Sequence, residues 1–303
     1  MKPFILATTS ILVFSGVLAE EVLPKIDMHL HARVVMPRTS NGDPIPLPCM
    51  PEPCTRRPAL ASDDGDILRL TLEIMERNNI VLGFLNDSLD QVYEWVEAAP
   101  DKFIASPSFG DPTSVDLNGL RREYEKGKIA GMGEIGSQYR GFAPNDSELD
   151  GIFALAAEFD VPTLIHTEGI AAASPDFRIA DGHPELLQEV LEKYPNLRLY
   201  MENAGYPFLD EAIALMYRYP NVYADLSTIT WIVPRETFYN YLEGLMDAGL
   251  GKRLMFGSDQ MWWPESIELA IDAIESAPVL SQEQKRDIFY NNAARFLRLE
   301  ETD

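Results

Sequence analysis

Two histidines, His29 and His31, stand two residues apart at the end of an apolar run. In a β-strand, residues i and i+2 point to the same face, so this pair can hold one metal ion together. The alternative is a pair of histidines on a polar strand face with no ligand role. Residues elsewhere in the chain help to decide between the two interpretations.

Three further apolar runs end near a side chain of a type that binds metal ions. Glu134 lies near the end of one run, His166 ends a second, and Asp259 follows a third. Any one of these residues alone is as readily a helix cap or a solvent-facing group. Together with the histidine pair, they place ligand-type side chains at four strand ends, which indicates one shared site.

The elements that must position these residues alternate between short β-branched runs and longer amphipathic stretches. Eight such units over about 280 residues match a closed (β/α)8 TIM barrel, although an open doubly wound sheet is also compatible. A closed barrel sets its eighth strand beside its first and directs every strand end to one site, so the ligand-type residues favour closure. The predicted strands are 22–30, 80–85, 103–108, 129–135, 162–166, 197–201, 222–226 and 253–257, and the predicted helices include 67–77, 91–98, 149–159, 184–193, 209–217, 236–247 and 266–276.

With these motifs the chain resembles the amidohydrolase superfamily, and within it the amidohydrolase-related (amidohydrolase 2) branch of metal-dependent TIM-barrel hydrolases. The likeness extends to the closing segment Asn292–Leu297 and so covers nearly the whole chain. It implies that Asp259 is the catalytic proton shuttle and that Glu134 takes the bridging position of two-metal members. It also implies a set of ligands for a divalent ion, namely His29, His31, His166 and Asp259.

One position departs from the family pattern, which places a histidine at the end of the sixth strand. Asn203 stands at the aligned position here, and Glu202 takes its place if the register shifts by one. Because asparagine is a weak zinc ligand, the departure favours one tightly held ion, with a two-ion centre as the alternative. Three histidines and a carboxylate suit Zn²⁺, with Mn²⁺ as a further alternative.

These ligands favour a metal-dependent hydrolase that attacks a small-molecule lactone, ester or amide with an activated water. One alternative is non-oxidative decarboxylation of a small carboxylic acid, an activity of the same branch. The other is a catalytically inactive barrel that binds a ligand or a metal.

The candidates for substrate binding follow the predicted strands. Asn203 is one. Arg140 suits two-point binding of a substrate carboxylate, although an arginine in an acidic chain also pairs readily with a neighbouring Asp or Glu. Trp262 can line an aromatic mouth, or it can pack against the long loop 32–61.

The composition and charge of the chain limit which classes of partner it can bind. A chain of 303 residues, 46% hydrophobic and 24% charged, suits a single globular domain over 20–303. The net charge of −23 repels phosphate backbones, so nucleic acid is not expected and a small-molecule substrate is. A homo-oligomer is compatible with the sequence.

The first 19 residues resemble a signal peptide, with Lys2 before the apolar run 4–18 and a small-residue cleavage site at Ala19. We expect cleavage after Ala19, export to the periplasm or the exterior, and a mature form that does not enter the membrane. In such a compartment Cys49 and Cys54 favour a disulfide, with free thiols or soft metal ligands as the alternatives.

Overall fold

The computed structural model describes residues 23–33, 38–43, 45, 47–51, 66–169 and 174–299. The predicted signal peptide lies outside these residues, as does Cys54, so the Cys49–Cys54 disulfide and the export of the chain stay predictions. The loop 32–61 is described only in part. None of the helices in the described ranges has the length and apolar character of a membrane-spanning segment.

The strands lie parallel to their neighbours in two hydrogen-bonded sheets, ordered β1-β2-β3 and β4-β5-β6-β7-β8. Each one overlaps a predicted run, because apolar β-branched segments between polar turns favour buried parallel strands. The bounds are β1 (Lys25–His31), β2 (Ile80–Asp87), β3 (Phe103–Pro107), β4 (Met132–Ile135), β5 (Thr163–Ile165), β6 (Leu199–Met201), β7 (Tyr223–Asp225) and β8 (Leu254–Met255).

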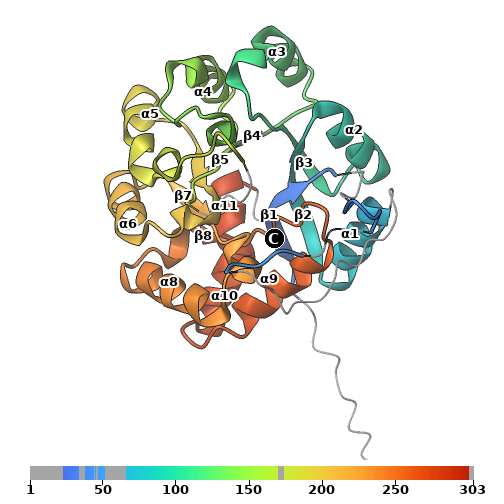
Figure 1. Cartoon of the computed structure of the whole chain (residues 1–303), viewed down its shortest axis with the longest axis vertical. Helices are drawn as coiled ribbons and strands as arrows, with labels where there is room; N and C mark the ends of the chain where they lie inside the picture. The colour runs from blue at the N-terminus through green and yellow to red at the C-terminus, as the bar shows by residue number, and fades with distance from the viewer. Residues whose placement is uncertain are drawn as a thin grey trace, which may run out of the picture.

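The two sheets join at both edges, so the strands form a closed ring (Figure 1). Between β8 and β1, the backbone N–H of Met28 donates to the carbonyl of Phe256 at 2.9 Å. Between β3 and β4, the N–H of Ala130 donates to the carbonyl of Ala105 at 2.9 Å. The predicted (β/α)8 TIM barrel is confirmed, and its first and last strands are neighbours.

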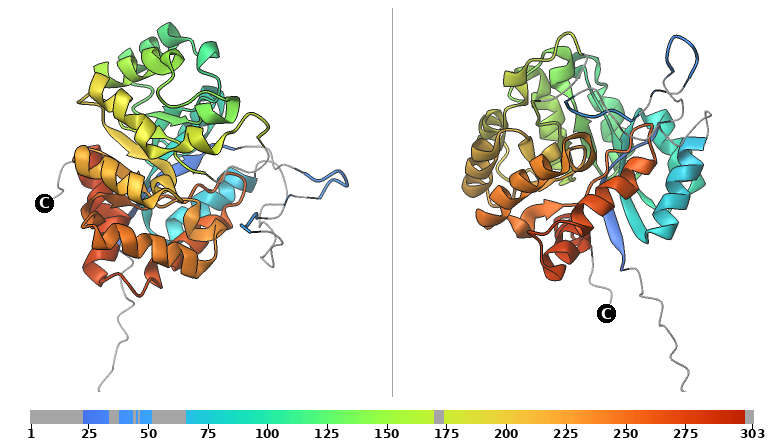
Figure 2. Two further views of the ribbon diagram at one scale, coloured as in Figure 1. Left: turned by 60° about the vertical axis from the view of Figure 1, so that its left-hand side comes forward. Right: turned by 60° about the horizontal axis from the view of Figure 1, so that its bottom comes forward.

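Helices surround the strands (Figures 1 and 2) because each buries one apolar face against the sheet. In α1, Ile67, Thr71, Ile74 and Met75 are buried at helical spacing. The helices are α1 (Asp66–Arg77), α2 (Leu89–Ala98), α3 (Leu117–Glu125), α4 (Asp150–Glu158), α5 (Leu187–Lys193), α6 (Leu209–Arg218), α7 (Ile229–Ile232), α8 (Arg235–Asp247), α9 (Glu265–Glu275), α10 (Gln282–Arg286) and α11 (Asn292–Leu297), with a π-helical turn over Asp287–Asn291.

A separate apolar cluster lies among the strands before they reach their polar ends. It includes Met28, Phe84, Leu164 and Tyr200, all fully buried. The Tyr200 hydroxyl donates to the Met28 carbonyl at 2.8 Å, and Phe296 of α11 packs edge-on against the Tyr200 ring. This packed layer gives the strand ends a rigid base.

Candidate metal centre

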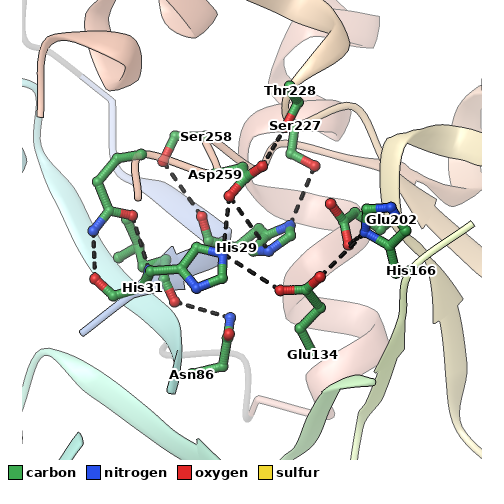
Figure 3. A network of polar contacts seen from close by, with 12 residues as sticks. His29, His31, Asn86, Glu134, His166, Glu202, Ser227, Thr228, Ser258 and Asp259 are labelled. Carbon is green, nitrogen blue, oxygen red and sulfur yellow. Dashed lines mark hydrogen bonds and ion pairs between the residues drawn. The ribbon is translucent and has the colours of Figure 1, made fainter. Parts of the chain in front are cut away.

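The end of β1 directs two imidazoles toward the carboxylate that follows β8 (Figure 3). His31 Nε2 lies 2.9 Å from Asp259 Oδ1, and His29 Nε2 lies 3.8 Å from the same oxygen. All three side chains are buried. Barrel closure thus brings together residues from the first and the last strand of the fold.

The position of Asp259 is set by its backbone and by one neighbour. The residue adopts a left-handed conformation with φ of 46°, which Asp tolerates better than most residues. Its N–H donates to the His29 carbonyl at 2.9 Å, and the Thr228 hydroxyl donates to Oδ2. With Oδ2 engaged in this way, Oδ1 faces the two histidines.

Among the described residues, His29 Nε2 has no hydrogen-bond partner, and Asp259 Oδ1 has none with regular hydrogen-bond geometry, although His31 Nε2 lies 2.9 Å from it. Leaving a buried polar atom unsatisfied costs about 1–3 kcal/mol, so a bound group is expected to complete them. Ligand atoms about 2 Å from one zinc ion lie about 3 to 4 Å apart. The spacing of these atoms and of His31 Nε2 fits a divalent cation.

Carboxylates also lie behind both imidazoles, on the side away from this position. His29 Nδ1 is 3.4 Å from Asp225 Oδ2 and 3.3 Å from the Ser227 hydroxyl. His31 Nδ1 is 3.9 Å from Asp87 Oδ2, beyond hydrogen-bond distance. The close partners on Nδ1 of His29 leave its Nε2 as the nitrogen that faces a metal.

Glu134, in β4, spans two parts of the centre. Its Oε2 is 3.5 Å from His31 Nε2, and its Oε1 is 3.1 Å from His166 Nδ1. Glu202 Oε2 approaches the same nitrogen of His166 at 2.7 Å. Among the described residues, three overlapping groups can hold an ion, and they are His29–His31–Glu134, His29–Glu202–Asp259 and Glu134–His166–Glu202.

Glu202 and Asn203 begin the turn that follows β6. In this turn Asn203 and Ala204 adopt positive φ of 53° and 48°, and the side chain of Glu202 is buried at the centre. The sequence motifs placed Asn203 at the position of the family's strand-six histidine. A register shift of one residue, which the sequence also allowed, would have placed Glu202 there. Positive φ is common for asparagine and rare for most residues, which suits residue 203 to such a turn.

The side-chain amide of Asn203 donates both of its hydrogens to other groups of the protein. Its Nδ2 donates to Glu168 Oε2 at 2.8 Å and to Glu202 Oε1 at 3.0 Å. Its Oδ1 accepts from the backbone N–H of Ile229 at 3.4 Å. These bonds orient the two glutamates, which makes Asn203 a positioning residue in this structure.

The second nitrogen of His166 also has partners. Nε2 is 3.2 Å from Glu168 Oε1 and 3.1 Å from the Tyr139 hydroxyl. The Tyr139 ring packs against the imidazole with centroids 4.7 Å apart. The role of Glu168 was missed, because a carboxylate just after a strand has the same local sequence pattern as a helix cap.

The remaining candidates for substrate binding lie at the rim. Arg140 is exposed and its side chain passes Gly110. The hydrogen bonds from Thr113, and after them the charge of Arg140, lower the pKa of Asp111. Trp262 is half-buried, and the guanidinium of Arg33 lies 4.8 Å from its ring centroid. Arg33 also pairs with Asp87 at 3.1 Å. Arg33 stands two residues after His31, and this spacing could have identified Arg33 from the sequence as a residue near the site.

The buried centre holds more acidic than imidazole groups. Burial raises the pKa of Asp27 to about 7, and burial also holds the pKa of Glu202 well above its usual range. Burial opposes ionisation of Glu134 too, but the hydrogen bond from His166 and the charge of His31 lower its pKa to about 2. A divalent cation neutralises such an excess of carboxylates. The buried carboxylates in and around the centre are Asp27, Asp87, Glu134, Glu168, Glu202, Asp225 and Asp259.

A cavity of about 620 Å³ lies to one side of the centre, and Asp87 is the residue of its lining that also lies near a histidine of the centre. It extends between α2 and α3, and its lining includes Tyr93, Ser108 and Phe109. Pockets for small organic ligands have volumes of about 300–1,000 Å³. The cavity is therefore of a suitable size for a small molecule.

Comparison with known proteins gives a family match over nearly the whole chain. A family model described as Amidohydrolase matches residues 26–299. Among curated proteins, Protein fluG from Emericella nidulans is 26% identical in an alignment of 155 residues that covers 46% of this chain. The match covers 18% of that protein, so this chain spans only a small part of its relative's length.

Solved structures share the fold at low identity. An uncharacterized TIM-barrel protein from Bordetella bronchiseptica aligns with a TM-score of 0.64 and 19% identity over 91% of this chain and 99% of its own. A probable 2-pyrone-4,6-dicarboxylic acid hydrolase from Acinetobacter baumannii aligns at 0.61 and 13% over 91% and 100%. A 5-carboxyvanillate decarboxylase from Sphingomonas paucimobilis aligns at 0.54 and 16% over 76% and 82%. Identities this low establish the barrel fold alone.

Proposed function

We propose, on the premise that this chain belongs to the amidohydrolase family, that it is a metal-dependent hydrolase of a small-molecule lactone, ester or amide. The family match confirms the resemblance that the motifs indicated. The observation that most directly supports the activity is the convergence of His29 Nε2 and His31 Nε2 on Asp259 Oδ1, at 3.8 and 2.9 Å.

Two cation positions are proposed, with different chemistry. The position between the β1 histidines and Asp259 is rich in nitrogen and suits Zn²⁺. The position formed by Glu134, His166 and Glu202 is richer in oxygen and suits a harder ion such as Mn²⁺. From the sequence, a single ion was favoured because Asn203 replaces the family histidine. Glu202 supplies a ligand oxygen at this place, which supports the second position.

The residues of the chain then have defined tasks. A divalent cation, when bound, supplies Lewis acidity that polarises a carbonyl group and lowers the pKa of water. Asp259 accepts the proton of the attacking water at Oδ1 and later donates it to the leaving group. Thr228, bound to Oδ2, keeps the carboxylate in one orientation through both transfers.

The surroundings support a small and uncharged or mixed-charge substrate rather than a polyanion. The net charge of −23 disfavours nucleic acid and other polyanions. Trp262, backed by Arg33, is the proposed rim contact for the substrate. We also propose that the chain is exported after cleavage near Ala19 and does not enter the membrane.

Elemental analysis of the purified chain, followed by a panel of lactones, esters, amides and aryl acids, tests the function. We expect one or two divalent ions per chain and hydrolysis of at least one neutral compound. Release of CO₂ from an aryl acid would favour the decarboxylase alternative. Stoichiometric metal without turnover of any compound would favour the inactive ligand-binding barrel, and a chain that binds no metal overturns the proposal.

A further inference from the structure

We infer that Asp225 is a positioning residue, which holds His29 as the tautomer with its hydrogen on Nδ1 so that Nε2 offers its lone pair to a cation. The inference rests on the cation position proposed between the β1 histidines and Asp259. It adds a residue that neither the sequence motifs nor the ligand-type groups of the centre single out.

The two oxygens of Asp225 have different surroundings. The residue ends β7 and is fully buried. Its Oδ1 accepts from the backbone N–H of Asn203 at 3.0 Å, from the N–H of Ser227 at 3.2 Å and from the Ser227 hydroxyl at 2.5 Å. Its Oδ2 has no hydrogen-bond partner that meets strict geometry among the described residues, and it lies 3.4 Å from His29 Nδ1. Three donors therefore fix the carboxylate and aim its second oxygen at the imidazole.

The proton on His29 follows from this arrangement. A carboxylate has no hydrogen to donate, and the single hydrogen of the Ser227 hydroxyl has two acceptors other than His29, namely Asp225 Oδ1 at 2.5 Å and Asn203 Oδ1 at 3.3 Å. The two atoms that face His29 Nδ1 are therefore both acceptors. A neutral imidazole places its one hydrogen on the nitrogen that faces acceptors, which leaves Nε2 bare on the cation side.

His31 supplies a comparison within the same strand. Its Nδ1 lies 3.9 Å from Asp87 Oδ2 and has no hydrogen-bond partner among the described residues. Asp87 is also engaged by Arg33. Asp87 therefore does not hold His31 as Asp225 holds His29, which makes it a matched control.

The variant Asp225→Asn separates this role from a general effect of charge. Its amide oxygen can still accept from the three donors at Oδ1, and its NH₂ group then faces His29 Nδ1 at the place of Oδ2. A donor at this place drives the imidazole hydrogen to Nε2, where it competes with the cation. In a serine protease triad, the same Asp-to-Asn change acts through the wrong histidine tautomer.

The measurement is competition of each protein with a chromogenic chelator for zinc chloride. We expect about 10- to 100-fold weaker zinc binding for Asp225→Asn and a change of less than about threefold for Asp87→Asn. In the zinc-loaded wild type, ¹⁵N-resolved NMR should show a protected, low-field hydrogen on Nδ1 of His29. That signal should be lost in Asp225→Asn.

Three results would overturn the inference. They are equal zinc affinity in Asp225→Asn and wild type, equal losses in both variants, and an NMR spectrum of the wild type in which His29 binds zinc through Nδ1. The last measurement needs no variant, so it decides the question even if Asp225→Asn does not fold. A wild type that binds no zinc counts instead against the proposed function.

Discussion

His31 Nε2 and Asp259 Oδ1 lie 2.9 Å apart across the junction of β1 and β8. Asp259→Asn should lower kcat by about 10²- to 10⁴-fold, because an amide cannot accept the proton at Oδ1. His29→Ala should abolish turnover by removing a ligand. Neither side chain belongs to the apolar cluster around Tyr200, so both variants should keep the circular dichroism spectrum of the wild type. Unchanged turnover in both would refute the assignment of the site.

Glu202 distinguishes one cation from two. Glu202→Gln should remove the ion held with Glu134 and His166 while the ion at the β1 histidines stays, so the metal content should fall by one ion per chain. Glu168→Gln is the control, since Glu168 contacts the same imidazole but lies outside the candidate ion-binding groups. Inductively coupled plasma mass spectrometry gives the counts. Equal metal content in wild type and Glu202→Gln contradicts the second position.

Thr228 should affect the rate more than the binding of substrate. Thr228→Val keeps the volume but removes the hydrogen bond to Asp259 Oδ2. Losing this bond to a charged group should lower kcat by about tenfold or more, which corresponds to about 1.4 kcal/mol, with KM changed little. Thr228→Ser restores a hydroxyl and should recover most of the rate. A change in KM alone would argue against the orientation of Asp259 by Thr228.

When a chelator has removed the metal, the free energy of unfolding of the protein should decrease as pH rises. Without a cation, burial raises the pKa of Asp27 to about 7 and holds that of Glu202 above its usual range. Burial acts to lower the pKa of His29 and of His166, but the charge of Glu202 and of other carboxylates outweighs it and raises both. All four groups bind more protons in the folded state. Their stabilising contribution is present below the unfolded pKa and is lost as pH rises through the folded pKa.

The melting temperature of the chelated protein should therefore decrease between about pH 5 and pH 8. The zinc-loaded protein should show a smaller decrease, because the cation takes the place of these protons. Differential scanning calorimetry of both forms in matched buffers gives the comparison. A melting temperature that increases with pH in the chelated form would contradict the expectation.

The strand framework was predictable from sequence because apolar, β-branched runs between polar turns have few other stable conformations. The ends of the strands were less predictable. The run 253–257 forms a regular strand only at Leu254–Met255, and the residues that follow keep single hydrogen bonds to β1 while they bring Asp259 to the centre. The four-residue helix α7 and the turn after β6 depend on tertiary contacts, which the hydrophobic periodicity of the sequence does not reveal.

The site also contains residues that were predictable from the sequence and residues that were not. His29 and His31 were found because strand geometry makes a spacing of two residues meaningful in any context. Asp225 and Glu168 have no such local signature, since a carboxylate that follows a strand usually caps the next helix. Their part in the centre comes from which strands become neighbours, and this is decided by closure of the whole barrel.

The hydrogen bond from Met28 to Phe256 joins the first strand to the last, and the histidines and Asp259 flank this junction. A nascent chain therefore carries its imidazoles from the beginning of synthesis but lacks their carboxylate partner until the eighth strand has emerged. The position between the β1 histidines and Asp259 is therefore completed only by the last part of the fold to be synthesised, once the ring closes.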